Sequence, residues 1–163
     1  MSVRFSSSAE EKFADIVSRY PKSDAALLPV LWLAQEEFDV LTPEVRAYVA
    51  RKLHLSAARV ESVVSFYTLY KTKPMGKHHI QICRNLSCSL RGCDRLMGWV
   101  VKNLGIKPSE TTPDWEYSYS TVECLAACGG APAIQIDGDY FENVTEQRLE
   151  ELIGRLKDNG KNR

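Results

Sequence analysis

Two pairs of cysteines are the residues in this sequence whose type and spacing could do chemistry. Cys83 and Cys88 are separated by four residues, Cys124 and Cys128 by three, and 35 residues lie between the pairs. Four thiolates can hold a [2Fe–2S] cluster, with two sulfurs on each iron. The pattern therefore predicts one such cluster, bound by Cys83, Cys88, Cys124 and Cys128 and carrying single electrons.

Three other uses of these cysteines compete with a cluster. Structural zinc sites use C-x2–4-C spacings, and the Cys83/Cys88 pair is at the long end of that range, so zinc stays as an alternative. A thioredoxin-type dithiol needs C-x-x-C, which the sequence lacks. Packing of all the cysteines as small hydrophobic residues fits poorly with the Asn- and Gly-bearing segments around them.

Cys93 is the fifth cysteine and leaves the count odd. It also follows Cys88 after four residues, which makes it a formal rival ligand. A cluster needs four protein ligands, and the second pair already supplies two of them. We therefore expect Cys93 to be a buried thiol that binds no metal.

Composition limits the class of protein. The 163 residues include 21 Lys and Arg and 21 Asp and Glu, so no net positive charge attracts nucleic acid. No apolar run is long enough to span a bilayer, and the first residues do not form a secretory signal. An odd number of cysteines without such a signal argues against a disulfide framework. We expect an intracellular protein without membrane insertion.

The segments around the cysteines predict a small mixed sheet over residues 76–158. Alternating residues predict one strand that delivers Cys83 at its end and a second that ends just before Cys124. The full order is a strand at 78–82, a helix at 90–104, a strand at 116–122, a hairpin at 133–141 and a helix capped by Thr145. This β-α-β-β-α order predicts a thioredoxin-like core.

The first part of the chain, residues 8–72, reads as a helical bundle. Helical spacing of apolar residues predicts four helices, at 8–19, 25–38, 43–53 and from Ser56 to about residue 70. Thr42 followed by Pro43 is a typical helix start. The segment 73–76 breaks the pattern, so the fold class is α+β, with a helical bundle before the cysteine-bearing domain.

Motifs for catalysis by the chain itself are missing from the sequence. It contains no phosphate-binding glycine loop, nucleophile–base pair or paired-carboxylate motif. We therefore expect no catalytic residues and no nicotinamide or flavin site in this chain.

Several motifs together resemble the 24-kDa-type subunit of NADH:quinone oxidoreductase, the respiratory complex I. They are Cys83-Arg-Asn-Leu-Ser-Cys88-Ser-Leu-Arg-Gly92, Val122-Glu-Cys-Leu-Ala-Ala-Cys128-Gly-Gly-Ala-Pro132 and Val60-Glu-Ser-Val-Val-Ser-Phe-Tyr67. The segments Gly76–Cys83, Leu104–Pro108 and Thr111–Asp114 also match. The resemblance covers about residues 10–157, nearly the whole chain.

This resemblance implies a thioredoxin-like ferredoxin domain with a helical extension and one [2Fe–2S] cluster on Cys83, Cys88, Cys124 and Cys128. It implies a partner flavoprotein that alone binds FMN and NADH, in a complex at the cytoplasmic face of the membrane. Equivalent subunits of NAD-linked hydrogenases or formate dehydrogenases are an alternative, and so is a free-standing thioredoxin-like ferredoxin. The helical extension argues against the free-standing form.

Two residues depart from the family pattern. Ala126 stands where the family usually has glycine in the loop between the second pair of cysteines, and Trp115 stands where glycine usually follows Thr-Thr-Pro-Asp. A side chain at position 126 disfavours a positive φ there.

Overall fold

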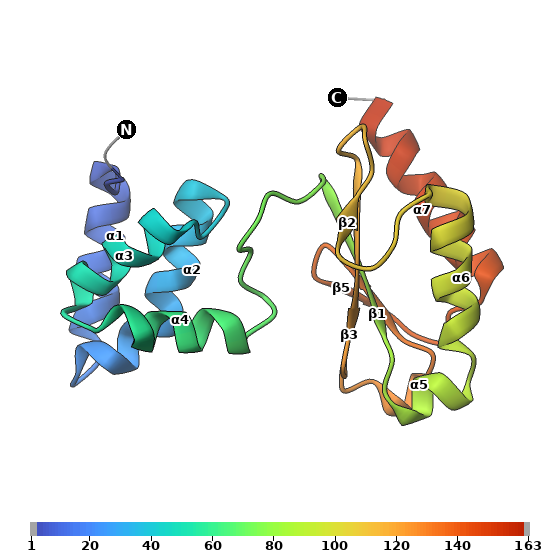
Figure 1. Cartoon of the computed structure of the whole chain (residues 1–163), viewed down its shortest axis with the longest axis horizontal. Coiled ribbons are helices and arrows are strands. Elements are labelled where there is room, and N and C mark those ends of the chain that lie inside the picture. The colour runs from blue at the N-terminus through green and yellow to red at the C-terminus, as the bar shows by residue number, and fades with distance from the viewer. Residues whose placement is uncertain (1–2, 162–163) are drawn as a thin grey trace. The chain divides into compact units, whose positions relative to one another are not determined.

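A computed structural model of the chain describes residues 3–161. The chain divides into two compact units, Met1–Pro74 and Met75–Arg163, which are the blue-to-green and the green-to-red parts of Figure 1. The division falls within the Pro- and Gly-bearing segment 73–76.

The first unit is helical. It contains α1 (Ser7–Ser18), a short 3-10 turn at Ser23–Ala26, α2 (Leu27–Phe38), α3 (Pro43–Leu53) and α4 (Ala57–Phe66). Ser6, Thr42 and Ser56 cap three of these helices, because each side-chain oxygen accepts a hydrogen bond from a backbone N–H of the first turn. The apolar faces meet in one core that includes Leu31, Leu41, Val49, Leu53 and Val60. The predicted start at Thr42-Pro43 is confirmed.

Helix α4 ends four residues earlier than the sequence predicted, at Phe66. The buried side chain of Gln35 explains this end. Its amide donates to the carbonyl oxygen of Leu69 at 3.2 Å and accepts from the Lys71 N–H at 2.5 Å. These bonds satisfy the backbone of residues 69–71 outside a helix, so a contact from α2 overrides the local helical pattern.

The second unit is built on a mixed sheet that has five strands within residues 3–161, in the order β2-β3-β1-β4-β5. The strands are β1 (His78–Cys83), β2 (Glu110–Thr111), β3 (Tyr117–Val122), β4 (Ile134–Ile136) and β5 (Asp139–Phe141). β1 pairs with β3 in parallel, and the other pairs are antiparallel. β2 lies in a segment that the sequence analysis did not identify as a strand.

β4, β5 and the turn between them form the hairpin predicted at 133–141. Asp137 has a φ of 52° and Gly138 a φ of 99°, the left-handed pair that suits a two-residue hairpin loop. The predicted hairpin is confirmed by the antiparallel register of Ile134 with Phe141.

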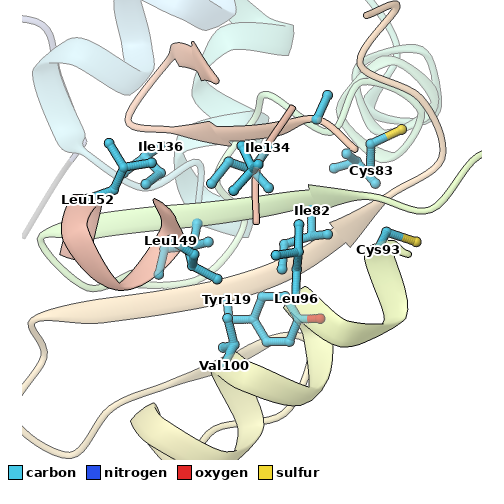
Figure 2. Packing of buried hydrophobic residues seen from close by; sticks show 14 of the residues in the cluster. Ile82, Cys83, Cys93, Leu96, Val100, Tyr119, Ile134, Ile136, Leu149 and Leu152 are labelled. Carbon is cyan, nitrogen blue, oxygen red and sulfur yellow. The ribbon is translucent and has the colours of Figure 1, made fainter. Parts of the chain in front are cut away.

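Three helices accompany the sheet: α5 (Leu86–Leu90), α6 (Cys93–Leu104) and α7 (Glu146–Lys161). Figure 2 shows Leu96 and Val100 of α6 and Leu149 of α7 around Ile82 and Tyr119, all of which are buried. The predicted single helix from residue 90 was wrong at its start. Gly92, with a φ of 92°, separates α5 from α6, because a left-handed residue cannot continue a right-handed helix.

The chain is therefore α+β with a helical first unit, as the sequence predicted. Within the part of the chain that the structure describes, no helix is both long and apolar enough to cross a bilayer.

Candidate metal centre

The two cysteine pairs follow neighbouring parallel strands. In the register of β1 with β3, Cys83 lies beside Val122, and Cys124 comes two residues later. Parallel strands end at the same edge of a sheet, and neighbouring strands are about 4.8 Å apart. The topology therefore brings the chain segments of both pairs to one edge of the sheet.

Cys83 and Cys88 form the buried half of this candidate site. Their exposed fractions are 3% and 2%, and they belong to the core that lies behind the sheet edge. Burial raises the pKa of the Cys88 thiol to about 11, and the adjacent Cys83 sulfur adds to the rise. Metal ligation needs the thiolate, so a bound cation is what would deprotonate this thiol at neutral pH.

A strand and a short helix position the buried half, because Cys83 is the last residue of β1 and Cys88 lies on α5. Cys88 lies in the middle of the five-residue helix α5. Asn85 begins this helix, with its side-chain oxygen accepting from the Leu86 N–H at 2.8 Å, and the Ser89 hydroxyl donates to the Arg84 carbonyl oxygen at 3.0 Å. Asn85, two residues after the end of β1, is a helix-start signal that the sequence reading missed.

Cys124 and Cys128 form the exposed half of the candidate site. They lie on a loop after β3, and Cys128 begins a three-residue 3-10 turn, Cys128–Gly130. The backbone N–H of Ala126 donates to the Cys124 Sγ at 3.2 Å. An N–H donor at a ligand sulfur stabilises negative charge there, which is one of the factors that set a cluster's reduction potential.

The two positions at which the resemblance implies glycine both have a left-handed backbone. Ala126 has a φ of 57° and Trp115 a φ of 60°. Glycine reaches this region without strain, whereas a Cβ makes it unfavourable. The predicted conflict at residue 126 is therefore present in the backbone, and Trp115 adds a second case at the opposite end of β3.

The two glycines after Cys128 differ in what they allow. A Cβ on Gly129 meets nothing within 4 Å, whereas a Cβ on Gly130 overlaps the Glu142 side chain and lies 2.6 Å from the Glu142 Cβ. Gly130 is also tied to the end of the hairpin, since its carbonyl oxygen accepts from the Asn143 N–H at 2.6 Å. Of these two glycines, Gly130 is therefore the one that permits a close approach of the backbone.

An ion pair joins the bases of the two cysteine segments. Arg84 follows Cys83, Glu123 precedes Cys124, and their side chains lie 2.5 Å apart. The Arg84 N–H also donates to the Val122 carbonyl oxygen at 3.0 Å, which extends the β1–β3 pairing to the first residue of the loop. Sequence reasoning missed this link because the strand register was needed to bring the two residues together.

Cys93 lies close to the buried pair. It is fully buried at the first position of α6, and Figure 2 shows its side chain and that of Cys83 near the carboxyl-terminal end of β1. Burial raises the pKa of the Cys93 thiol, and its Sγ is 3.8 Å from the Ser89 hydroxyl. The expected burial of this thiol is confirmed, and Cys93 lies near Cys83 of the buried pair.

The donor set fits an iron–sulfur cluster in its chemistry. All five cysteines lie in the described part of the chain and are free thiols, and four of them come in two pairs at one sheet edge. Among residues 3–161, however, no three His, Cys, Asp or Glu side chains lie close enough together to form a metal site. The buried and exposed pairs share an edge of the sheet without closing into one coordination sphere.

The family model of the thioredoxin-like [2Fe–2S] ferredoxins matches residues 13–157. The match covers most of both units, so the chain belongs to the thioredoxin-like [2Fe–2S] ferredoxin family. The predicted thioredoxin-like fold is confirmed by this match.

Within this family, the chain is similar to subunits of NADH-quinone oxidoreductase. The chain is 40% identical over 146 residues to the E-type subunit of NADH-quinone oxidoreductase of Rickettsia bellii (strain RML369-C), covering 88% of this chain and 87% of the relative. It is 40% identical over 143 residues to the second E-type subunit of the same enzyme of Rhizobium meliloti (strain 1021), covering 88% and 85%. The resemblance to this subunit of NADH:quinone oxidoreductase is confirmed.

Similarity in structure extends to an NAD+-reducing [NiFe]-hydrogenase. A chain of that enzyme in its air-oxidized state superposes with a TM-score of 0.69 at 20% identity, over 82% of this chain and 23% of the hydrogenase chain. At this identity the likeness shows a shared fold, and the chain spans about a quarter of the hydrogenase chain.

Proposed function

We propose that this chain is the electron-transfer subunit of an NADH:quinone oxidoreductase and holds one [2Fe–2S] cluster on Cys83, Cys88, Cys124 and Cys128. The observation that carries the proposal is the parallel pairing of β1 with β3, which places both cysteine pairs at one edge of the sheet. The similarity to NADH-quinone oxidoreductase subunits over almost the whole of both chains supports the same assignment.

The residues of the chain have distinct tasks in this proposal. The buried pair, Cys83 and Cys88, presents two sulfurs from the packed core, and Cys124 and Cys128 present two from the loop. The Ala126 N–H stabilises negative charge on Cys124, and the Arg84–Glu123 pair ties the two segments together. The cluster, when bound, supplies a site that gains and loses one electron. The chain itself has no catalytic residues and binds neither FMN nor NADH.

The two units divide the work. Residues 76–158 form the cluster domain, and residues 8–72 form a helical bundle that supplies no ligand. The partner is the flavoprotein that binds FMN and NADH, and the complex lies at the cytoplasmic face of the membrane without insertion of this chain.

Exposed aromatic and aliphatic side chains on the helical unit support a partner surface there. Trp32 is 47% exposed and Phe66 76% exposed, and Leu28 lies one helical turn from Trp32 on α2. Leu28, Phe66 and Tyr67 line one groove of about 250 Å³. Aromatic residues concentrate in the binding centres of protein interfaces. We assign the flavoprotein contact to this surface.

Electron delivery from the flavoprotein tests the proposed function. The anaerobically purified chain mixed with its flavoprotein should have its cluster reduced by NADH, seen as an EPR signal, whereas the chain with NADH alone should stay oxidised. Trp32→Ala and Phe66→Ala should each weaken flavoprotein binding at least about tenfold and keep the cluster. Tyr20→Ala, at another exposed aromatic residue of this unit, is the control and should bind normally.

NADH reduction of the cluster without flavoprotein would contradict the proposed division of labour. If both the Trp32 and the Phe66 variant bound the flavoprotein as tightly as the wild type, the interface would have to lie outside the helical unit. Identifying the proteins that copurify with the native chain separates a quinone-linked complex from a hydrogenase or formate dehydrogenase.

A further inference from the structure

The backbone at Ala126 is held in a conformation that its side chain opposes. Its φ is 57°, in the left-handed region where the Cβ of an L-residue crowds the backbone. Asp137 and Asn143, at other left-handed positions of the chain, are residue types that are common there, whereas alanine is not. A strained residue persists only where the surrounding structure imposes its conformation, and such residues cluster at functional sites.

Ala126 occupies the middle of the loop between Cys124 and Cys128, and its two sides are fixed differently. On the amino-terminal side, its N–H donates to the Cys124 Sγ at 3.2 Å. On the carboxyl-terminal side, its left-handed φ sets the direction of the chain toward Cys128, which begins the 3-10 turn. Rotation about the N–Cα bond of Ala126, which sets φ, therefore moves Cys128. The peptide before Ala126 keeps its hydrogen bond to the Cys124 sulfur.

The two halves of the site differ in how much packing surrounds them. Cys83 and Cys88 are held by core packing and by α5, whereas Cys124 and Cys128 are exposed. The Ala126 backbone is thus where strain acts directly on the relative position of two proposed ligands.

We propose that Ala126 is a positioning residue whose strained backbone limits how long the chain retains its cluster. The inference rests on the proposed function, because it takes Cys124 and Cys128 as ligands. In this proposal the loop leaves its left-handed conformation at Ala126 when the cluster is lost, so the strain favours release. Removing the Cβ should slow cluster loss, and adding a β-branched side chain, which tolerates positive φ least, should accelerate it.

The test is a series at position 126 in the full-length chain with its cluster. Cluster loss to an excess of an iron chelator is followed by visible absorbance, and the reduction potential is measured on the same samples. Ala126→Gly should lose the cluster about five- to tenfold more slowly, at an unchanged potential, because the N–H remains. Ala126→Val should lose it faster, with a more negative potential, because displacement of the loop weakens the N–H donation to Cys124.

Two controls make the same kinds of change at other positions. Gly129→Ala adds a methyl group to the same loop, where a Cβ meets nothing and φ is not positive, and should leave the loss rate and the potential unchanged. Trp115→Gly relieves the same kind of strain at the opposite end of β3, and should raise the thermal midpoint without slowing cluster loss.

If Ala126→Gly loses its cluster at the wild-type rate, the inference is overturned. If Ala126→Val does not fold, the result for Ala126→Gly decides the question alone. Equal slowing by Trp115→Gly also overturns it, since the effect would then be one of general stability. A wild-type chain that takes up no iron and sulfide would contradict the proposed function itself. A stable cluster that all position 126 variants lose at the same rate would contradict only this inference.

Discussion

The two cysteine pairs occupy very different parts of the same fold. Cys83 and Cys88 are almost completely buried, one at the end of a central strand and the other in a helix. Cys124 and Cys128 lie exposed on a loop whose middle residue has a left-handed backbone. Packing fixes the first pair, and a few local contacts fix the second. One half of the proposed site is therefore part of the core, and the other half lies on an exposed loop.

Replacement of single cysteines should give the largest effect. Serine in place of Cys83, Cys88, Cys124 or Cys128 should abolish cluster binding, because its oxygen is a harder and poorer ligand for these irons. Cys93→Ser should keep the cluster. Iron and sulfide analysis of anaerobically prepared variants measures the outcome. Cluster loss from Cys93→Ser, with full retention in one of the other four, would show that the ligand assignment is wrong.

A methyl group on Gly130 should have the next largest effect. Its Cβ would overlap the Glu142 side chain down to the Glu142 Cβ, which cannot rotate away, so the backbone must shift. We expect Gly130→Ala to lower the free energy of unfolding by about 1–3 kcal/mol, as overpacking does. Gly129→Ala, with open space at its Cβ, should change it by less than about 0.5 kcal/mol. Denaturant unfolding of the cluster-free chains measures both, and equal values would show that the hairpin does not constrain this loop.

An effect of similar size should separate the two pairs without a cluster. In the cluster-free chain, Cys88→Ser buries a hydroxyl among apolar side chains and should cost about 1–3 kcal/mol of unfolding free energy. Cys128→Ser exchanges exposed groups and should cost less than about 0.5 kcal/mol. The same denaturant titrations report the values. A large cost at Cys128 would mean that the exposed loop is part of the folded core, and the contrast between the pairs would disappear.

The parts of the fold that follow local rules were predictable from the sequence. The strand ending at Cys83, the helix start at Thr42-Pro43 and the hairpin at Asp137-Gly138 each depend on neighbouring residues, and each is present. The α+β class followed from their order.

Features that depend on distant contacts were not predictable in the same way. The end of α4 is set by Gln35, which lies 34 residues before the carbonyl group of Leu69 that it binds. The Arg84–Glu123 pair needed the β1–β3 register. The helix that carries Cys88 did have a local signal in Asn85, but five residues are too short for a periodic pattern.

The candidate site was predictable as a set of residue types and not as a geometry. Spacing selected four cysteines and left Cys93 as a rival, and nothing in that spacing indicated that one pair is buried and the other exposed. The conflict at Ala126 was predictable only through the family resemblance, which implies glycine at that position, because a Cβ opposes a positive φ.

Metal and sulfide analysis of the wild-type chain, combined with EPR spectroscopy, tests the central claim most directly. Purified anaerobically, the chain should contain about two irons and about two acid-labile sulfides, and reduction should give the EPR signal of one unpaired electron shared by the two irons. Stoichiometric zinc without sulfide, in protein never exposed to oxygen, would contradict the account and return the cysteines to a structural site.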